Sequence, residues 1–128
     1  MQIIKRISPV LLATVWISIS EFFRNEFLVK QQWVEHYKHM GLQFPSSPVN
    51  GAVWGLWSLL FAVAIAILSK KFTFLQTAFL AWFVGFVLMW VTIGNLGVLP
   101  YGILVYAIPL SLLESFVAVW IVKKTSKS

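Results

Sequence analysis

The sequence predicts an all-α fold, a polytopic bundle of four transmembrane helices. Of its 128 residues, 59% are hydrophobic and only 11% are charged, and the mean hydropathy is +0.84. Soluble domains carry about 25% charged residues, so this chain has too little polar surface for a water-soluble fold. Its apolar residues form four stretches, and a helix needs roughly 20 such residues to cross the hydrocarbon of a bilayer. We therefore expect one four-span domain, with spans at about 7–29, 49–69, 72–94 and 102–122.

The first span depends on how the residues after its apolar core are interpreted. The apolar run Ile7–Ile19 is too short to cross a bilayer and reaches that length only if the helix continues past Glu21. A basic start, this apolar run and the small residues before Glu21 also match a cleavable signal peptide. Because the chain starts at Met1 with the segment in place, we expect an uncleaved first span.

The segment after the first span is predicted to be an amphipathic helix outside the hydrocarbon. Its polar and aromatic side chains fall on different faces up to about Met40, after which Gly41 and the sequence FPSSP end the helix. A helix from Ile7 to Met40 would be about 51 Å long, far more than a span needs. We therefore expect a bend near Lys30 and an outer segment at about 30–48.

Small residues mark one face of the second span. They recur every three or four positions, at Gly51, Gly55, Ser58, Ala62 and Ala66. Small side chains let membrane helices approach closely, so we interpret this face as a packing seam within the chain rather than a dimer interface. Trp54 and Trp57 lie beside the glycines. We expect at least one of these indoles to line a pocket with its N–H hydrogen-bonded.

The second and fourth spans resemble each other. The sequence SLLFAVAIAILSKK, from Ser58, aligns without gaps to SLLESFVAVWIVKK, from Ser111, and this places Phe61 opposite Glu114. A duplication would make the chain two similarly oriented helical hairpins, a parallel repeat that some transporters use. Apolar helices also resemble each other by chance, so both interpretations stay open.

Three basic clusters account for the net charge of +6 and predict the topology. They precede the first span, separate the second from the third, and follow the fourth: Lys5 and Arg6; Lys70 and Lys71; Lys123, Lys124 and Lys127. With four spans, all three clusters fall on one side, which the positive-inside rule makes cytoplasmic. We expect both termini to be cytoplasmic in a cell membrane, the inner membrane in a Gram-negative bacterium. The basic excess then reflects topology, and no nucleic-acid partner is expected.

The four acidic residues carry most of the functional information: Glu21, Glu26, Glu35 and Glu114. A helix that enters the hydrocarbon near Ile7 places Glu21 about 21 Å deep and Arg24 about 26 Å deep, within a core of about 30 Å. By the same rise, Glu114 lies about 13 Å from the cytoplasmic face. Charged groups that face lipid are costly, so we expect these three to face the bundle interior within reach of one another. Whether Glu114 pairs with Arg24 stays open.

A polar binding site in the outer half of the membrane is therefore expected. Its candidate residues are Glu21, Arg24, Asn25, Glu26, Gln32, His36, Asn50, Trp54, Asn95 and Glu114. Arg24 should contact a carboxylate, and if it satisfies Glu21, we expect Glu114 to be protonated because burial penalises the charged form. Two interpretations without a binding function stay open. The charges could serve only to hold the helices together, or a short tilted span could leave them in water.

The leading hypothesis for the function is binding or transport of a small ion or polar solute at this site. An accessory or scaffold subunit that docks a partner through 30–48 is the main alternative, and a membrane enzyme acting on lipid at the outer interface is the third. We expect the lipid bilayer as a partner, and a homo-oligomer or larger membrane complex is consistent with the sequence. The absence of cysteine excludes thiol catalysis, and His36 and His39 lack the further ligands of a metal motif. We expect no metal, no cofactor and no catalytic residues, so the sequence favours a non-enzymatic role.

Overall fold

A computed structural model describes residues 2–126, and all regular structure within them is helical. In chain order the elements are α1 (Gln2–Phe23), the π-helix η1 (Arg24–Leu28), α2 (Lys30–His39), α3 (Pro48–Ser69), α4 (Phe74–Trp82), the π-helix η2 (Phe83–Val87), α5 (Leu88–Asn95), the 3₁₀-helix η3 (Tyr101–Ile103) and α6 (Leu104–Thr125). The expected all-α fold class is confirmed.

Four helical segments are long and apolar enough to cross a membrane, namely Gln2–Leu28, Pro48–Ser69, Phe74–Asn95 and Tyr101–Thr125. The last three agree with the expected boundaries to within a few residues. The first begins earlier than expected and, as predicted, continues past Glu21. The protein is therefore a membrane-embedded helical bundle.

The first helix bends at Val29, close to the expected position. The backbone of this residue has φ −124° and ψ 6°, which interrupts the helix between η1 and α2. The Trp33 amide still bonds the Val29 carbonyl (3.2 Å), so α2 starts again at once in a new direction. Val29 is fully buried in a small cluster with Leu99 and Ile103, and this packing holds the bend in place.

Local sequence signals set the starts of α3 and α4. Pro48 occupies the first turn of α3, where its missing N–H costs nothing. At α4, Thr73 and Gln76 form a reciprocal capping box. The Gln76 amide donates to Thr73 Oγ1 (3.2 Å), and the Thr73 amide donates to Gln76 Oε1 (3.1 Å). These two spans therefore begin at residue patterns that reduce the cost of their free first-turn amides.

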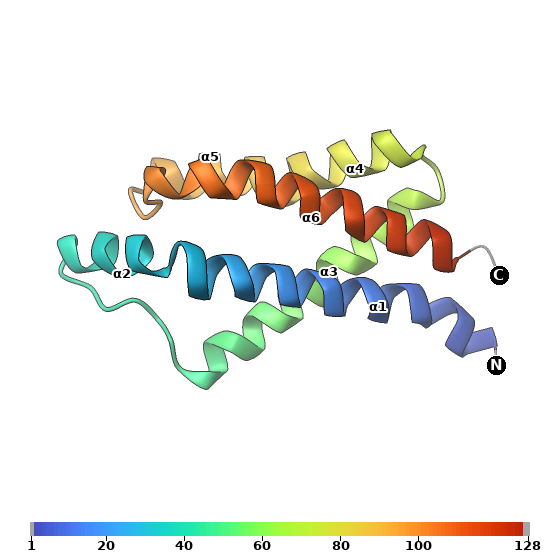
Figure 1. The fold of residues 1–128 in the computed structure, drawn as a ribbon, viewed down its shortest axis with the longest axis horizontal. Coiled ribbons are helices and arrows are strands. Elements are labelled where there is room, and N and C mark those ends of the chain that lie inside the picture. Colours follow the sequence, from blue (N-terminus) through green and yellow to red (C-terminus); the bar gives the residue numbers. More distant parts are fainter. Residues whose placement is uncertain (1, 127–128) are drawn as a thin grey trace.

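The spans pack as one bundle in which α6 contacts helices of all three other spans. α1 packs against α3 and α6, and α6 also packs against α3 and α4. Figure 1 shows both ends of the chain at one end of the bundle and α2 at the opposite end. α3 crosses α1 at an angle, so its N-terminal half diverges from α1 toward the α2 end (Figure 1).

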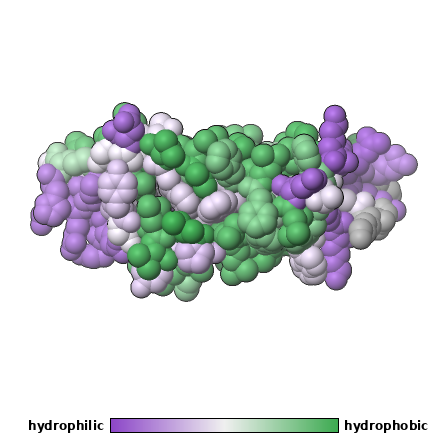
Figure 2. All heavy atoms as spheres, turned by 90° about the horizontal axis from the view of Figure 1, so that it is seen from above, coloured by the Kyte–Doolittle hydropathy of each residue, from purple (hydrophilic) through white to green (hydrophobic). Residues whose placement is uncertain are grey.

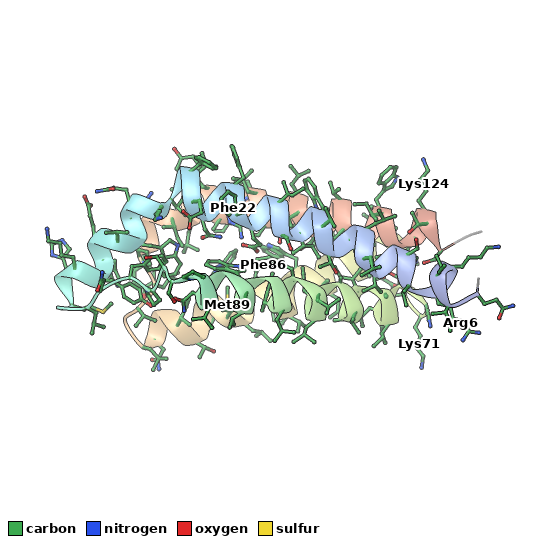
Figure 3. All side chains as sticks on the ribbon, turned by 90° about the horizontal axis from the view of Figure 1, so that it is seen from below. Arg6, Phe22, Lys71, Phe86, Met89 and Lys124 are labelled. Carbon is green, nitrogen blue, oxygen red and sulfur yellow. The ribbon has the colours of Figure 1, made fainter. Side chains whose placement is uncertain are left out.

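The surface is divided into an apolar belt and two polar ends. Figure 2 shows hydrophobic residues around the middle of the bundle and hydrophilic residues gathered at both ends. Arg6, Lys71 and Lys124, one from each basic cluster, lie at the same end (Figure 3). We call this the basic end, and the opposite one the α2 end. Lys127 of the third cluster lies outside the described residues.

The core is built largely from small residues that let the helices approach closely. Ala13, Ala62, Ala78 and Ala118 are each fully buried, one on each spanning segment. The larger side chains Phe61, Ile65 and Phe86 fill the remaining space. Close contact of this kind holds membrane helices together where lipid supplies no hydrophobic drive.

The small-residue face of α3 is a packing seam only in its inner half. Ser58 and Ala62 are fully buried, in agreement with the prediction. At Gly51 and Gly55, an added Cβ would meet no atom within 4 Å, so the prediction is wrong for this half. The reason is the inclination of α3, which carries these glycines away from α1 and leaves space beside them.

Candidate intramembrane binding site

The site begins where α1 passes into the π-helix η1. The buried face of α1 carries Ala13, Ile17 and Glu21 at every fourth position. The π-turn closes with the bond from the Val29 amide to the Arg24 carbonyl (3.0 Å), and Arg24 is the buried residue of this turn. Glu21 and Arg24 therefore both face the bundle interior. Single π-turns in α-helices occur frequently at functional sites.

Arg24 lies between two carboxylates from different helices. Its Nη2 is 2.6 Å from Glu21 Oε2 in the same helix, and its Nη1 is 3.5 Å from Glu114 Oε1 of α6. The exposed fractions are 5% for Arg24, 4% for Glu21 and 0% for Glu114. The predictions that Arg24 contacts a carboxylate and that these residues face the bundle interior are confirmed. Arg24 contacts both carboxylates, so Glu114 has a cation beside it, although a more distant one than Glu21 has.

A chain of hydrogen bonds fixes Glu21 from the outer side. Asn25 Nδ2 donates to Glu21 Oε2 and to the Glu21 carbonyl, each at 3.0 Å. Trp33 of α2 donates from Nε1 to Asn25 Oδ1 at 3.2 Å. Glu21 Oε2 thus accepts from both Arg24 and Asn25, which is the arrangement suited to an ionised carboxylate. The position of α2 is linked through Trp33 to the charged cluster.

Glu114 is held differently, without hydrogen bonds to its carboxyl group. Neither of its side-chain oxygens has a hydrogen-bond partner among the described residues, and the same holds for Arg24 Nη1 and Ser115 Oγ. Ser20 and Glu21 are the polar residues of α1 that face Glu114. Within residues 2–126, no hydrogen bond joins the Glu114 carboxyl group to Ser111 or Ser115 of its own helix. A buried acceptor without a donor is costly, so this carboxyl group has unused binding capacity.

Two indole groups fix α6 at the level of Glu114. Trp16 of α1 donates from Nε1 to the Glu114 carbonyl (2.9 Å), and Trp82 of α4 donates from Nε1 to Ser111 Oγ (2.9 Å). The two donors come from helices on different sides of α6. They hold the backbone around Glu114 in place while the carboxyl group itself has no donor.

An aromatic platform supports the guanidinium. Arg24 Cζ lies 5.6 Å from the ring centroid of Phe86, the buried residue of η2. Figure 3 shows Phe86 in the interior of the bundle. The Phe86 ring makes edge-to-face contacts with Trp57 (5.6 Å) and Phe61 (5.5 Å). A cation over an aromatic face is attracted by the ring quadrupole, so this wall stabilises positive charge.

A first cavity, of about 550 Å³, lies between α1 and the N-terminal half of α3. We call it the lateral cavity. Glu21, Phe22 and Asn25 line it on one side, and Gly51 and Gly55 line it on the other. It occupies the space that the inclination of α3 leaves open, and its walls are mostly apolar.

A second cavity, of about 410 Å³, lies on the other side of α3, and we call it the aromatic cavity. Arg24 lines it together with seven large aromatic side chains, Trp33, Tyr37, Phe44, Trp54, Trp57, Phe86 and Trp90. Both cavities also include Glu21, Asn25, Asn50 and Trp54 in their walls. The charged cluster is therefore reached from two sides of α3.

Six of the ten candidate residues lie at the cluster or line both cavities. Glu21, Arg24, Asn25 and Glu114 form the cluster and its support, and Asn50 and Trp54 are shared by the two cavities. Asn50 also closes the start of α3, because Ser47 donates to its Oδ1 from the backbone amide (3.0 Å) and from Oγ (2.8 Å). It therefore both caps the start of α3 and lines the two cavities.

The other four candidates lie farther from the cluster. Glu26 lines the lateral cavity but is ion-paired with Lys30 at 2.9 Å in an exposed position. Gln32 packs against Gly102, where an added Cβ would lie 2.6 Å from Gln32 Oε1. His36 Nε2 lies 2.7 Å from the Gly97 carbonyl. Asn95 is exposed and lines neither cavity. Gln32 and His36 thus attach α2 to the bundle instead of entering the cavities.

The structure tests the expectation for the two tryptophans of α3. Both Trp54 and Trp57 line the aromatic cavity, as predicted for at least one of them. No hydrogen bond joins either indole N–H to another of the residues 2–126, so that part of the prediction is wrong. Each indole instead presents its ring to the cavity.

Sequence reasoning missed the aromatic wall as a unit. Trp33, Phe86 and Trp90 were not among the candidate residues. The one available signal was the gathering of aromatic residues in three separate stretches, at 33–44, 54–57 and 86–90. Nothing in the sequence shows that these stretches meet.

Comparison of the chain with protein-family models, with curated proteins and with solved structures finds no significant match. Within residues 2–126, no group of three or more His, Cys, Asp or Glu side chains could hold a metal ion.

Proposed function

We propose that the protein is an integral cell-membrane protein that binds and moves a small ion or polar solute at the cluster of Glu21, Arg24 and Glu114. The charge count of this buried cluster is the observation that carries the proposal. Two carboxylates share one guanidinium, so two negative charges and one positive charge leave one negative charge in excess. A buried excess charge is costly, so the cluster is stabilised by taking up one proton or one cation.

The two carboxylates differ in a way that suits exchange. Glu21 is fixed by donors from Arg24 and Asn25, whereas the Glu114 oxygens have no hydrogen-bond partner among the described residues. The excess charge can therefore be neutralised at Glu114 without breaking an existing hydrogen bond. We assign Glu114 as the exchanging group, Glu21 as the fixed carboxylate, and Arg24 as the group that holds them together.

The orientation follows from the basic residues. Arg6, Lys71 and Lys124 lie at the same end of the bundle, which the positive-inside rule assigns to the cytoplasm (Figure 3). The two cavities lie toward the α2 end, which then faces outward. Under this assignment the site opens to the outer half of the membrane.

The cavities favour this function over the two alternatives. A scaffold subunit requires no hollow beside its charged residues, yet Glu21 lines two cavities of several hundred Å³. Trp33 and Tyr37 of α2, the expected docking segment, face the aromatic cavity. A lipid-modifying enzyme needs an activated nucleophile, whereas both carboxylates of the cluster lie against Arg24 and no thiol or imidazole lies in the cluster.

Infrared difference spectroscopy on the full chain in lipid nanodiscs tests the proposal. A protonated carboxyl group absorbs apart from ionised carboxylates, so the excess proton is visible directly. Near neutral pH and without added metal cations, the wild-type protein should show one protonated carboxyl that is lost as the pH rises. Glu114→Gln should lack this signal, because the remaining Glu21 is balanced by Arg24.

Glu26→Gln is the matched control, because Glu26 is an exposed carboxylate of the same helix with its own lysine partner. This variant should keep the wild-type signal. A wild-type spectrum without a protonated carboxyl, or a signal that survives in Glu114→Gln, contradicts the proposal. Movement is measured with a pH-sensitive dye in proteoliposomes, where Glu114→Gln should reduce the rate to that of protein-free vesicles.

A further inference from the structure

We infer that the ligand of the aromatic cavity is an organic cation, an ammonium group with apolar substituents. This inference rests on the proposed function and names the class of solute for the same site. The cavity volume of about 410 Å³ falls within the range of roughly 300–1,000 Å³ that is typical of small-molecule sites. The remaining question is which chemistry its walls select.

Aromatic side chains are the most numerous kind of residue in these walls, and Phe44 of the loop after α2 is one of them. α2 contributes Trp33 and Tyr37, and α3 contributes Trp54 and Trp57. Phe86 and Trp90 come from η2 and α5, with their ring centroids 6.0 Å apart. Rings around a hollow are the usual means of recognising quaternary ammonium groups, through the negative faces of their π-systems. The Phe86 ring already holds one cation of the chain, the Arg24 guanidinium.

The charges around the cavity favour a cation over an anion. The Glu21 carboxylate lines it, and the cluster behind it carries one negative charge in excess. An anion would have Arg24 as its only cationic partner in the wall. The Nη2 of this residue bonds Glu21, and its Nη1 lies 3.5 Å from Glu114. An anion would therefore have to compete with two carboxylates for one guanidinium.

Apolar substituents are favoured because the approach to the cluster is apolar. The lateral cavity is bordered by Ile19 and Phe22, which are both exposed on the apolar belt and face lipid. Gly51 and Gly55 leave this passage open on the α3 side. A hydrated inorganic cation would lose its water against such walls, whereas an alkyl or aryl ammonium partitions there readily. We therefore infer that the solute enters from the bilayer, between α1 and α3.

The test compares three probes of similar shape and different charge. Phenyltrimethylammonium is the cation, tert-butylbenzene is its neutral isostere, and benzenesulfonate is the anion. Binding to the full chain in nanodiscs of lipid with no net charge is followed by tryptophan fluorescence and by equilibrium dialysis. The cation should bind saturably and at least about tenfold more tightly than either other probe, and protons should be released as it binds.

Substitutions of Trp54 test whether binding occurs in this cavity. Trp54 is 39% exposed and makes no ring-to-ring contact among the described residues, so its replacement should leave the fold intact. Trp54→Leu should weaken cation binding about three- to thirtyfold, whereas Trp54→Phe should keep most of it. The control is Trp120→Leu, which removes a 51% exposed indole at the basic end. The ammonium group of Lys124 lies over the ring of this indole. This control should bind like the wild type.

Equal binding of the cation and its neutral isostere overturns the inference, and so does cation binding that Trp54→Leu leaves unchanged. If the infrared carboxyl signal titrates as proposed while phenyltrimethylammonium does not bind, the inference fails and the proposed function stands. If the carboxyl signal is also absent, both fail.

Discussion

Arg24 and Phe86 are the buried residues of the two π-helices, and they lie against each other, with the guanidinium carbon 5.6 Å from the ring centroid. The two wide turns therefore meet at one level of the bundle. Each belongs to the first span of a helical hairpin. The second spans of the same hairpins place Phe61 and Glu114 at aligned positions, and both are buried. At this level of the bundle, the first hairpin contributes Arg24 and Phe61, and the second hairpin contributes Glu114 and Phe86.

The first prediction concerns the stability of the charged cluster. Arg24→Ala should lower the free energy of unfolding by about 3–5 kcal/mol, because it leaves two buried carboxylates without a cation. Adding Glu21→Gln to Arg24→Ala should recover much of this loss, since only Glu114 then remains. Thermal unfolding in detergent measures both variants.

The exposed pair of Glu26 and Lys30 is the control for that prediction, because Lys30→Ala should cost at most about 1 kcal/mol. A double variant no more stable than Arg24→Ala alone would show that Glu21 and Arg24 are not coupled.

The second prediction follows from the charge count at the same cluster. Arg24→Gln removes the guanidinium of the cluster, so each buried carboxylate must then take up its own proton. The infrared signal of protonated carboxyl should roughly double relative to the wild type at neutral pH. An unchanged signal would mean that Arg24 does not balance a carboxylate.

The third prediction uses two glycines with opposite surroundings. A Cβ at Gly85 would lie 2.6 Å from Phe61 Cε1, and the Phe61 ring is packed between Trp57 and Phe86. Gly85→Ala should therefore destabilise the bundle by about 1–3 kcal/mol through overpacking.

Gly51→Ala is the matched control, because an added Cβ there meets no atom within 4 Å. It should be neutral, or should stabilise the protein by up to about 1 kcal/mol through helix propensity. Equal effects of the two substitutions in thermal unfolding would contradict the packing described around Phe61.

The fourth prediction concerns topology. The chain has no cysteine, so single cysteines can be introduced without background labelling. A cysteine at Ser46, in the loop before α3, should react with a membrane-impermeant thiol reagent from outside the cell. A cysteine at Ser126, just after α6, should react only after the membrane is opened. Labelling of both from the same side would exclude the four-span arrangement.

The fold could be predicted almost completely from the sequence, because lipid imposes a simple rule on apolar length. The three later spans needed only a count of apolar residues between charges. The first span needed one further argument, that Glu21 and Arg24 could lie inside the bundle if they faced each other. Their spacing of three residues made that possible.

The cavities could not be predicted, because they depend on how far α3 leans away from α1. The glycines at 51 and 55 are compatible with close contact or with open space, and the sequence does not distinguish the two. The π-helices were equally hidden, since no residue pattern marks them. For the same reason the contact of Phe86 with Arg24 was unforeseen. Depth placed Glu114 within reach of Arg24 but did not decide whether the two residues pair.

The excess negative charge at the cluster also has an electrical consequence. Moving one positive charge across the whole membrane potential changes its free energy by about 2.3 kcal/mol per 100 mV. A charge that crosses only part of the membrane changes its free energy by the corresponding fraction. An ion that reaches Glu114 from the outer side would travel through part of this field. Occupancy of the cluster should then rise as the cell interior becomes more negative. Proteoliposomes with an imposed potassium diffusion potential would reveal this as voltage-dependent binding of phenyltrimethylammonium.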